Sequence, residues 1–195
     1  MSLASVGEAI WVLGIVAWYV IRYSFERRAK RARIVKDKNS LLDKVGLASA
    51  LFGLAIFPVF YVISGIPEAA DFPVHLWTVI LGGGIFLSAL VLFRITHKSL
   101  GKNWSITLQI REQHCLVRTG PYALVRHPMY TSFLLMVSGQ FFLLANWFVG
   151  LLGLLGFAIL FFLRVDKEEE MMLDKFGQQY RSYMGTSKRI IPFVY

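Results

Sequence analysis

This sequence of 195 residues contains little cysteine and little charge, and each shortage excludes a class of protein. Its single cysteine, Cys115, cannot form an intramolecular disulfide, so a disulfide framework is excluded. Charged residues make up 17% of the chain, well below the roughly 25% of soluble globular domains. The sequence also lacks a phosphate-binding loop, a GxGxxG after a strand and a GxSxG. A soluble enzyme with a Rossmann cofactor domain is therefore excluded.

Long apolar stretches dominate what is present. Apolar residues make up 56% of the chain, aromatic residues 15%, and the mean hydropathy is +0.55. Basic residues follow the first stretch and no small-residue cleavage site comes after it, so we expect a retained span rather than a secretory signal. The sequence predicts an all-α integral membrane protein, one domain with five transmembrane helices. The five windows are residues 6–21, 42–66, 74–93, 130–145 and 147–163.

The positive charges lie between these windows and test the topology. All 21 lysines and arginines fall in residues 22–44 (nine), 94–126 (six) and 164–189 (six). Five alternating spans place all three basic segments on one side, which the positive-inside rule makes cytoplasmic. We therefore expect the amino terminus outside and the carboxyl terminus inside. Topology and anionic membrane lipids then explain the net charge of +9, and nucleic acid is not needed as a partner.

The two halves of the chain differ in character. Residues 1–93 have the pattern of a three-span scaffold, in which Gly82-Gly83-Gly84 predicts close helix packing and Pro58 a kink. Residues 94–128 are too polar for a span and too long for a simple connection, so we expect a folded cytoplasmic segment packed over the helix ends. In residues 94–195 this segment is followed by a helical hairpin, which turns at residues 145–147, and by a cytoplasmic tail.

Two polar clusters lie at the ends of that hairpin. The first is GPYALVRHPMY at residues 120–130, and the second is LRVDKEEEMMLDKFGQQY at residues 163–180. A hairpin returns the second cluster to the face that the first one left. Charged residues near apolar spans pair with one another, meet water or hold a ligand. We therefore expect the two clusters to build one site.

The first cluster has the features of a helix start. Pro128 disfavours a helical conformation at His127 and suits the first position of a helix. Arg126, His127 and Tyr130 would then lie at the amino end of the fourth span, where free N–H groups favour an anion. The same three residue types also suit an interfacial anchor. The residues alone leave a ligand site and an anchor about equally supported.

The second cluster contains one predicted ion pair. Arg164 and Glu168 are four residues apart, so a continuing helix places them on one face. Glu169 and Glu170 are expected on a solvated acidic face of the same helix. His75 and His97 are expected at the membrane interface. No metal site is predicted, because the histidines and the cysteine lack the spacing of known metal ligands.

The combination of GPYALVRHPMY, KEEEMMLDKFGQQYRSYM and a closing IIPF resembles the isoprenylcysteine carboxyl methyltransferase family of integral membrane enzymes. The family pattern runs (S/T)GxYxxxRHPxYxG, an apolar hairpin, RxxxE(E), FGxxYxxY and PF, and it matches roughly residues 109–193. The RHPxY segment alone is shared with phospholipid methyltransferases and some membrane sterol reductases. One departure is Ser132, where the family usually has glycine, which bears on the acceptor pocket.

The resemblance implies S-adenosylmethionine as the methyl donor, S-adenosylhomocysteine as the product, and a donor pocket that faces the cytoplasm. Arg164 matches the arginine that in the family faces the methyl acceptor. A lipophilic acceptor would enter between the spans from the bilayer. The donor contacts carried over by position are Gln109, His114, Cys115, Leu116, Val117, Tyr122, His127, Pro128, Met129, Tyr130 and Glu168.

A mechanism and its rivals follow from that resemblance. An acceptor carboxylate is ionised at neutral pH and needs no base, so orientation and a water-poor pocket supply the rate. We expect Arg164 to hold the acceptor carboxylate and Glu168 to bind the cationic end of the donor. A phospholipid amine methyltransferase would instead need Glu168 or His127 as a base. A nicotinamide-dependent membrane reductase and a non-enzymatic membrane scaffold remain as further alternatives.

Overall fold

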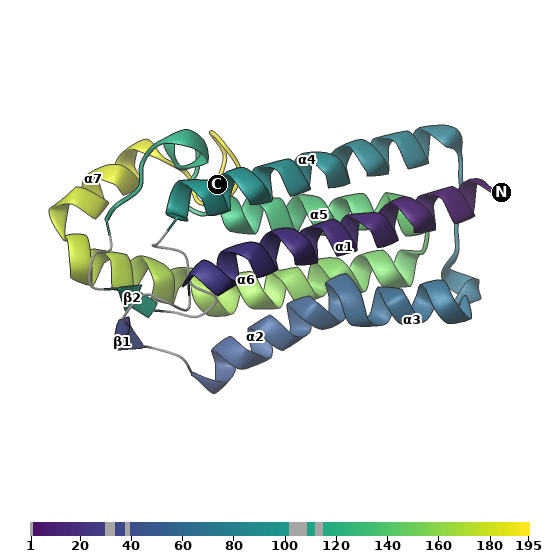
Figure 1. Cartoon of the computed structure of the whole chain (residues 1–195), viewed down its shortest axis with the longest axis horizontal. Helices are drawn as coiled ribbons and strands as arrows, with labels where there is room; N and C mark the ends of the chain where they lie inside the picture. Colours follow the sequence, from purple (N-terminus) through teal and green to yellow (C-terminus); the bar gives the residue numbers. More distant parts are fainter. Residues whose placement is uncertain (1, 30–33, 38–39, 102–108, 112–114) are drawn as a thin grey trace.

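The computed structural model describes residues 2–29, 34–37, 40–101, 109–111 and 115–195. Helical rods run side by side along its long axis (Figure 1). In this described part four rods are long and apolar enough to cross a membrane, and a shorter apolar helix of 17 residues accompanies them. The rods are α1 (Leu3–Ala29), α2 (Leu41–Leu51) continuing through η1 (Phe52–Ile56) into α3 (Phe57–Ser64), α4 (Leu76–Leu100), α5 (Pro128–Leu144) and α6 (Trp147–Phe176).

Each of the five predicted apolar windows coincides with one of these rods, but their ends differ from the prediction. The helix α6 continues 13 residues past position 163, so the second polar cluster is helical from Arg164 to Phe176. The helix α7 (Gln178–Thr186) follows after Gly177, whose φ of 52° breaks the rod. The charged residues of the second polar cluster therefore continue the helix α6 beyond its apolar part.

One short strand pair, which the sequence did not predict, accompanies the helical architecture. Strand β1 (Ile34–Asp37), which belongs to the first basic segment, pairs antiparallel with β2 (Gln109–Arg111). The β-branched residues Ile34 and Val35 favour a strand there. Two short 3-10 turns, η2 (Glu68–Ala70) and η4 (Gly120–Ala123), complete the described elements.

Small residues bring α4 and α5 into close contact. A Cβ added to Gly82 would lie 2.8 Å from the Cβ of Phe142, and one added to Gly139 would lie 2.9 Å from the backbone nitrogen of Phe86. The packing role predicted for the glycine triplet is therefore confirmed for Gly82. It is wrong for Gly84, where an added Cβ meets no atom within 4 Å.

A buried polar contact joins three rods inside the apolar bundle. The indole of Trp11 in α1 donates to the side-chain oxygen of Gln140 in α5 at 3.1 Å. The Gln140 amide donates in turn to the carbonyl oxygen of Gly53 at 2.9 Å. Gly53 belongs to η1, a π-helical turn, and such turns interrupt the regular backbone pairing. The departure from regular helix that we expected at Pro58 is therefore this π-helical turn, which ends just before Pro58.

The hairpin predicted between α5 and α6 is confirmed. Ala145 adopts the left-handed conformation with a φ of 47°, and the Asn146 side chain caps α6 by accepting from the Val149 amide at 2.9 Å. The Asn146 amide also donates to an Asp71 carboxylate oxygen at 2.6 Å. The turn is thus fixed to the preceding loop, and α6 returns to the end of the bundle where α5 began (Figure 1).

Gly156→Ala is expected to destabilise the bundle, because the new Cβ would collide with the carbonyl oxygen of Ser49 in α2. Overpacking of this kind costs about 1–3 kcal/mol. Gly84→Ala is the matched control, since its Cβ points into open space and alanine favours a helix over glycine by about 1 kcal/mol. Thermal unfolding in detergent should show a lower midpoint for the first variant only. Equal midpoints would contradict the close α2–α6 contact.

Candidate active site

The first polar cluster forms a corner at the start of α5, and the carboxyl-terminal segment holds it. Pro128 occupies the first turn of α5, and His127 precedes it with a non-helical φ of −126°. The backbone amides of Arg126 and His127 donate to the carbonyl oxygens of Lys188 and Arg189 at 2.7 and 2.9 Å. The backbone of the corner is therefore hydrogen-bonded to the carboxyl-terminal segment and is not a free loop.

The second polar cluster faces this corner from α6. Arg164 and Glu168 form the predicted i,i+4 ion pair, with 3.2 Å between Nη2 and Oε1. The Tyr130 hydroxyl donates to the same Glu168 oxygen at 2.8 Å. The other Glu168 oxygen lies 3.5 Å from Nδ1 of His127. The expectation that the hairpin brings the two clusters together is confirmed.

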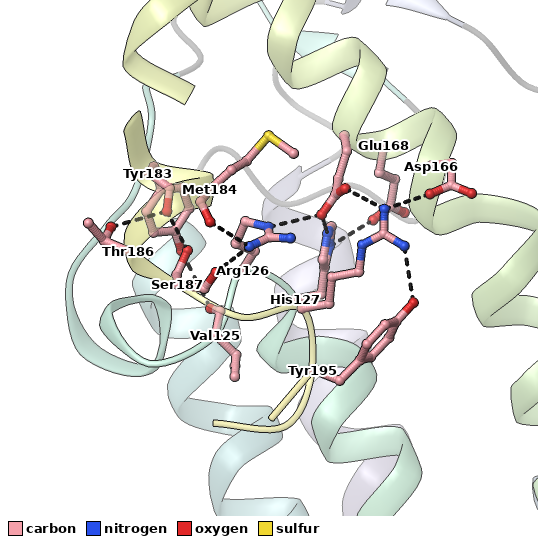
Figure 2. A network of polar contacts seen from close by, with 12 residues as sticks. Val125, Arg126, His127, Asp166, Glu168, Tyr183, Met184, Thr186, Ser187 and Tyr195 are labelled. Carbon is pink, nitrogen blue, oxygen red and sulfur yellow. Dashed lines mark hydrogen bonds and ion pairs between the residues drawn. The ribbon is translucent and has the colours of Figure 1, made fainter. Parts of the chain in front are cut away.

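Glu169 occupies the centre of the contact between the clusters. Its side chain is 5% exposed and ion-pairs with Arg126 at 2.9 Å, with His127 at 3.2 Å and with Arg189 at 2.7 Å. Figure 2 shows Arg126 and His127 together in this network. The expectation of a solvated Glu169 is therefore wrong, because its cationic partners come from segments about 20 and 43 residues away. Glu170 is exposed, as expected.

The paired carboxylates favour a positive charge on His127. Burial of the imidazole opposes protonation, but hydrogen bonds and attraction from Glu168 and Glu169 outweigh it and raise the pKa of His127 above its ordinary value. Burial also raises the pKa of the Tyr183 hydroxyl to about 12, so this group stays protonated. The Tyr183 hydroxyl donates to the carbonyl oxygen of Tyr122 at 2.5 Å and ties α7 to the turn η4.

A cavity of about 510 Å³ opens beside the contact between the clusters. Its walls come from α1, the α2–η1 rod, α4, α5 and α6, so both halves of the chain build it. Most of the walls are apolar, with Trp18, Leu51, Leu54, Phe93 and Leu160 among the lining residues. One end is polar. The polar lining residues are Tyr19, Arg22, His97, Tyr122, Arg126, His127, Tyr130, Arg164 and Glu168.

The structure brings only part of the predicted donor set to this cavity. Of the predicted residues whose side chains are described, Tyr122, His127, Met129, Tyr130, Arg164 and Glu168 line it. Four others do not line it, namely Cys115, Leu116, Val117 and Pro128. Cys115 is exposed, whereas Pro128 is buried at the corner. His114 and the side chain of Gln109 lie outside the described residues.

Ser132, which replaces the usual family glycine, is fully buried at the start of α5. Its hydroxyl donates to the carbonyl oxygen of Met129 at 2.7 Å, within the same helix. The polar atom is thereby satisfied without a partner on another helix. Ser132 is not among the residues that line the cavity in the described part of the chain.

Two residues of the first half were not assigned to the site from the sequence. His97 is fully buried rather than interfacial, so the expectation for it is wrong. Its Nδ1 lies 2.8 Å from the carbonyl oxygen of Phe93, and its ring packs against Phe25 and Phe93. Arg22 lines the cavity from α1. The only sequence signal for Arg22 is a charge four residues after Trp18, on the same face of the first helix.

The raised pKa of His127 predicts how stability depends on pH. The folded value lies above the unfolded value of about 6.5, so this stabilisation is fully present below pH 6.5 and is lost as pH rises through the folded value. A tenfold difference in proton affinity between the folded and unfolded states corresponds to about 1.4 kcal/mol in the free energy of unfolding. Unfolding in detergent from about pH 6 to 9 should show this loss in the wild type and not in His127→Gln. Parallel profiles would contradict a protonated His127.

Comparison with known proteins finds relatives of one family. Residues 79–174 match the model of the isoprenylcysteine carboxyl methyltransferase family. Protein-S-isoprenylcysteine O-methyltransferase B of Arabidopsis thaliana is 29% identical over 163 residues, which cover 78% of this chain and 81% of that protein. Protein-S-isoprenylcysteine O-methyltransferase of Schizosaccharomyces pombe is 35% identical over 83 residues, which cover 43% of this chain and 35% of that protein.

The fold points the same way. The solved structure of the eukaryotic intramembrane Ras methyltransferase ICMT superposes with a TM-score of 0.57 at 26% identity. The match covers 80% of this chain and 54% of the solved chain, so this chain spans about half the length of that protein. The long apolar helices and this likeness make the chain a multi-pass integral membrane protein. Motifs, family model and fold agree, and together they make the chain similar to the isoprenylcysteine carboxyl methyltransferase family.

Proposed function

We propose that this chain is a membrane enzyme that transfers a methyl group from S-adenosylmethionine to the carboxylate of an isoprenylated cysteine. One observation carries the proposal: Leu160, Arg164 and Glu168 line the cavity at successive turns of α6. An apolar wall thus leads directly to a buried cation and then to a carboxylate. Such an order suits a lipid tail, an anionic acceptor group and a cationic donor. The relatives named as protein-S-isoprenylcysteine O-methyltransferases support this acceptor.

We further propose that all five rods span the bilayer, with the amino terminus outside and the site cytoplasmic. The described parts of all three basic segments lie at the end of the bundle opposite the amino terminus, where β1, β2 and α7 are found (Figure 1). The positive-inside rule makes that end cytoplasmic. A donor would then enter from the cytoplasm and an acceptor tail laterally from the bilayer.

The residues at the polar end fit a donor that carries both a cation and an anion. Glu168 offers a carboxylate at the cavity surface, and His127, whose protonated form the neighbouring carboxylates favour, lies beside it. Tyr130 donates to Glu168 and so fixes the orientation of that carboxylate. Bound S-adenosylmethionine would supply an electrophilic methyl group on a sulfonium sulfur. The contacts carried over to Gln109, His114, Cys115, Leu116, Val117, Tyr122, Pro128 and Met129 are proposals of the same kind.

Arg164 would position the acceptor carboxylate for in-line transfer. In that transfer a carboxylate oxygen forms a bond to the methyl carbon as the bond from carbon to sulfur breaks. The electron pair of that bond stays on sulfur, so a sulfonium and a carboxylate become a thioether and an ester. No proton moves, and no base is required. The task of the site is therefore to orient the reactants and exclude water.

The absence of a proton transfer favours this acceptor over a phospholipid amine. Methylation of an amine releases a proton that a base must accept. Glu168 and Glu169 raise the pKa of His127 and so favour its protonated form, which cannot accept a proton. Glu168 is itself ion-paired with Arg164, which favours its carboxylate form as a binding group. A carboxylate acceptor uses both groups in the charge states that the structure supports.

Donor binding tests the class of enzyme. Purified protein is expected to bind S-adenosylhomocysteine, and not NADPH, in titration calorimetry. Glu168→Gln should weaken that binding about tenfold or more, because a hydrogen bond to a charged group contributes roughly 1.5–3 kcal/mol. Glu170→Gln, exposed on the same helix, is the matched control and should bind as the wild type does. Binding of NADPH instead would indicate a reductase, and binding of neither compound a scaffold.

Acceptor turnover tests the role of Arg164. The wild type is expected to methylate N-acetyl-S-farnesyl-L-cysteine and not phosphatidylethanolamine. Arg164→Gln should lower kcat/KM for the farnesylcysteine about thirtyfold or more, since loss of a buried charge partner costs roughly 2–5 kcal/mol. Arg181→Gln removes an exposed arginine of α7 and should leave turnover unchanged. Full turnover in Arg164→Ala with normal acceptor affinity would contradict the assignment.

A further inference from the structure

The first helix contributes a charge to the cavity that the reaction above leaves without a role. Arg22 of α1 is half-buried and lines the cavity. Its guanidinium carbon lies 5.5 Å from the centre of the Trp18 ring, one helical turn earlier. Trp18 lines the cavity too and is 7% exposed. Arg22 therefore stands at the cavity wall on a rigid helical element, held over an aromatic ring.

Arg22 faces the same space as Arg164. The two residues come from α1 and α6, both line the cavity, and their charges are close enough to act on each other. Arg22 also acts electrostatically on His97, which lines the cavity from α4. Like charges that converge on a mostly apolar cavity repel each other more strongly than in water, because an apolar wall screens them little. An anion between the two guanidinium groups would turn this repulsion into two attractions.

The charges around the cavity are unequal. Three arginines line it in the described part of the chain, against one carboxylate, Glu168. Arg126 pairs with Glu169 outside the lining, and Arg164 pairs with Glu168. The charge of Glu26, one turn further along α1, attracts Arg22 but does not line the cavity. Positive charge is therefore in excess, on the side of the cavity that α1 provides.

We propose that Arg22 is a second binding residue for the anionic end of the methyl acceptor, whose carboxylate lies between Arg22 and Arg164. The inference rests on the proposed function and deepens it, because two guanidinium groups would make the site selective for an acceptor with a free carboxylate. A guanidinium group binds a carboxylate with fixed geometry. Two of them, from α1 and α6, fix the orientation of the carboxylate better than one. A protonated amine would be repelled by both.

This role makes Arg22 a determinant of affinity for the acceptor and not for the donor. The proposed donor residues that line the cavity lie on η4, at the corner before α5, on α5 and on α6. Arg22 lies on α1, where it contacts Trp18 and acts electrostatically on Glu26, Arg164 and His97. Loss of Arg22 should therefore weaken binding of an acid and leave binding of its uncharged amide unchanged. The ratio of the two affinities reports the interaction with the carboxylate, independently of the farnesyl tail.

The experiment measures that ratio by titration calorimetry on the full chain in detergent, saturated with S-adenosylhomocysteine. The ligands are N-acetyl-S-farnesyl-L-cysteine and its carboxamide. The wild type is expected to prefer the acid, and Arg22→Gln to lose about tenfold or more of that preference with an unchanged Kd for the amide. Arg22→Lys should give an intermediate preference. Arg27→Gln is the matched control on α1, because Arg27 is exposed and is not among the lining residues.

Every other outcome overturns the inference. An acid preference in Arg22→Gln equal to that of the wild type would show that Arg22 does not touch the carboxylate. Weaker binding of S-adenosylhomocysteine with an unchanged acid preference would assign Arg22 to the donor. If Arg22→Gln fails to fold, the wild type and Arg22→Lys are compared, and equal preferences contradict the proposal. A wild type that binds no S-adenosylhomocysteine and methylates nothing refutes the proposed function, and the inference with it.

Discussion

The site depends on one buried carboxylate. Glu169 accepts ion pairs from Arg126 and His127 at the start of α5 and from Arg189 in the carboxyl-terminal segment. A buried carboxylate without cationic partners would cost several kcal/mol, so these contacts are compulsory once α6 carries Glu169 into the interior. They bring three segments together that are separate in sequence. With that contact in place, Glu168, one residue earlier, is directed at Tyr130 and at the cavity.

The two halves of the chain contribute different parts of the cavity. The carboxyl-terminal half supplies the polar groups that would meet the donor, from η4, α5 and α6. The amino-terminal half supplies apolar wall through Trp18, Leu51, Leu54 and Phe93, together with the charge of Arg22. The contact among Trp11, Gln140 and Gly53 joins these halves inside the apolar layer. The first three rods are therefore part of the ligand cavity and not only the scaffold that their sequence pattern indicates.

The features that could be predicted from the sequence are those that depend on residues close together in the chain. Apolar length identified each rod, and the turn residues near Asn146 identified the hairpin that brings the two clusters together. The i,i+4 spacing alone indicated the Arg164–Glu168 pair. The missed features all depend on contacts between distant segments. Glu169 resembles its exposed neighbour Glu170 in sequence, and only the return of Arg126 and Arg189 makes one of them buried.

The same reasoning explains the errors at the other helices. The basic residues that flank His97 favour the interface, yet the rings of Phe25 and Phe93 enclose it. The strand β1 could not be derived, because its partner β2 lies over 70 residues further along the chain. The sequence places Arg22 near the end of an apolar span. It does not show which face of the bundle the side chain would meet. Such contacts become visible only when the rods are packed.

The most direct test of the central claim is an experimental structure of the protein in lipid with S-adenosylhomocysteine bound. The account predicts one ligand that touches both the corner at His127 and Tyr130 and the α6 turn at Glu168. A structure in which the ligand contacts only one of the two, or in which the corner and the turn lie on opposite faces of the membrane, would contradict it.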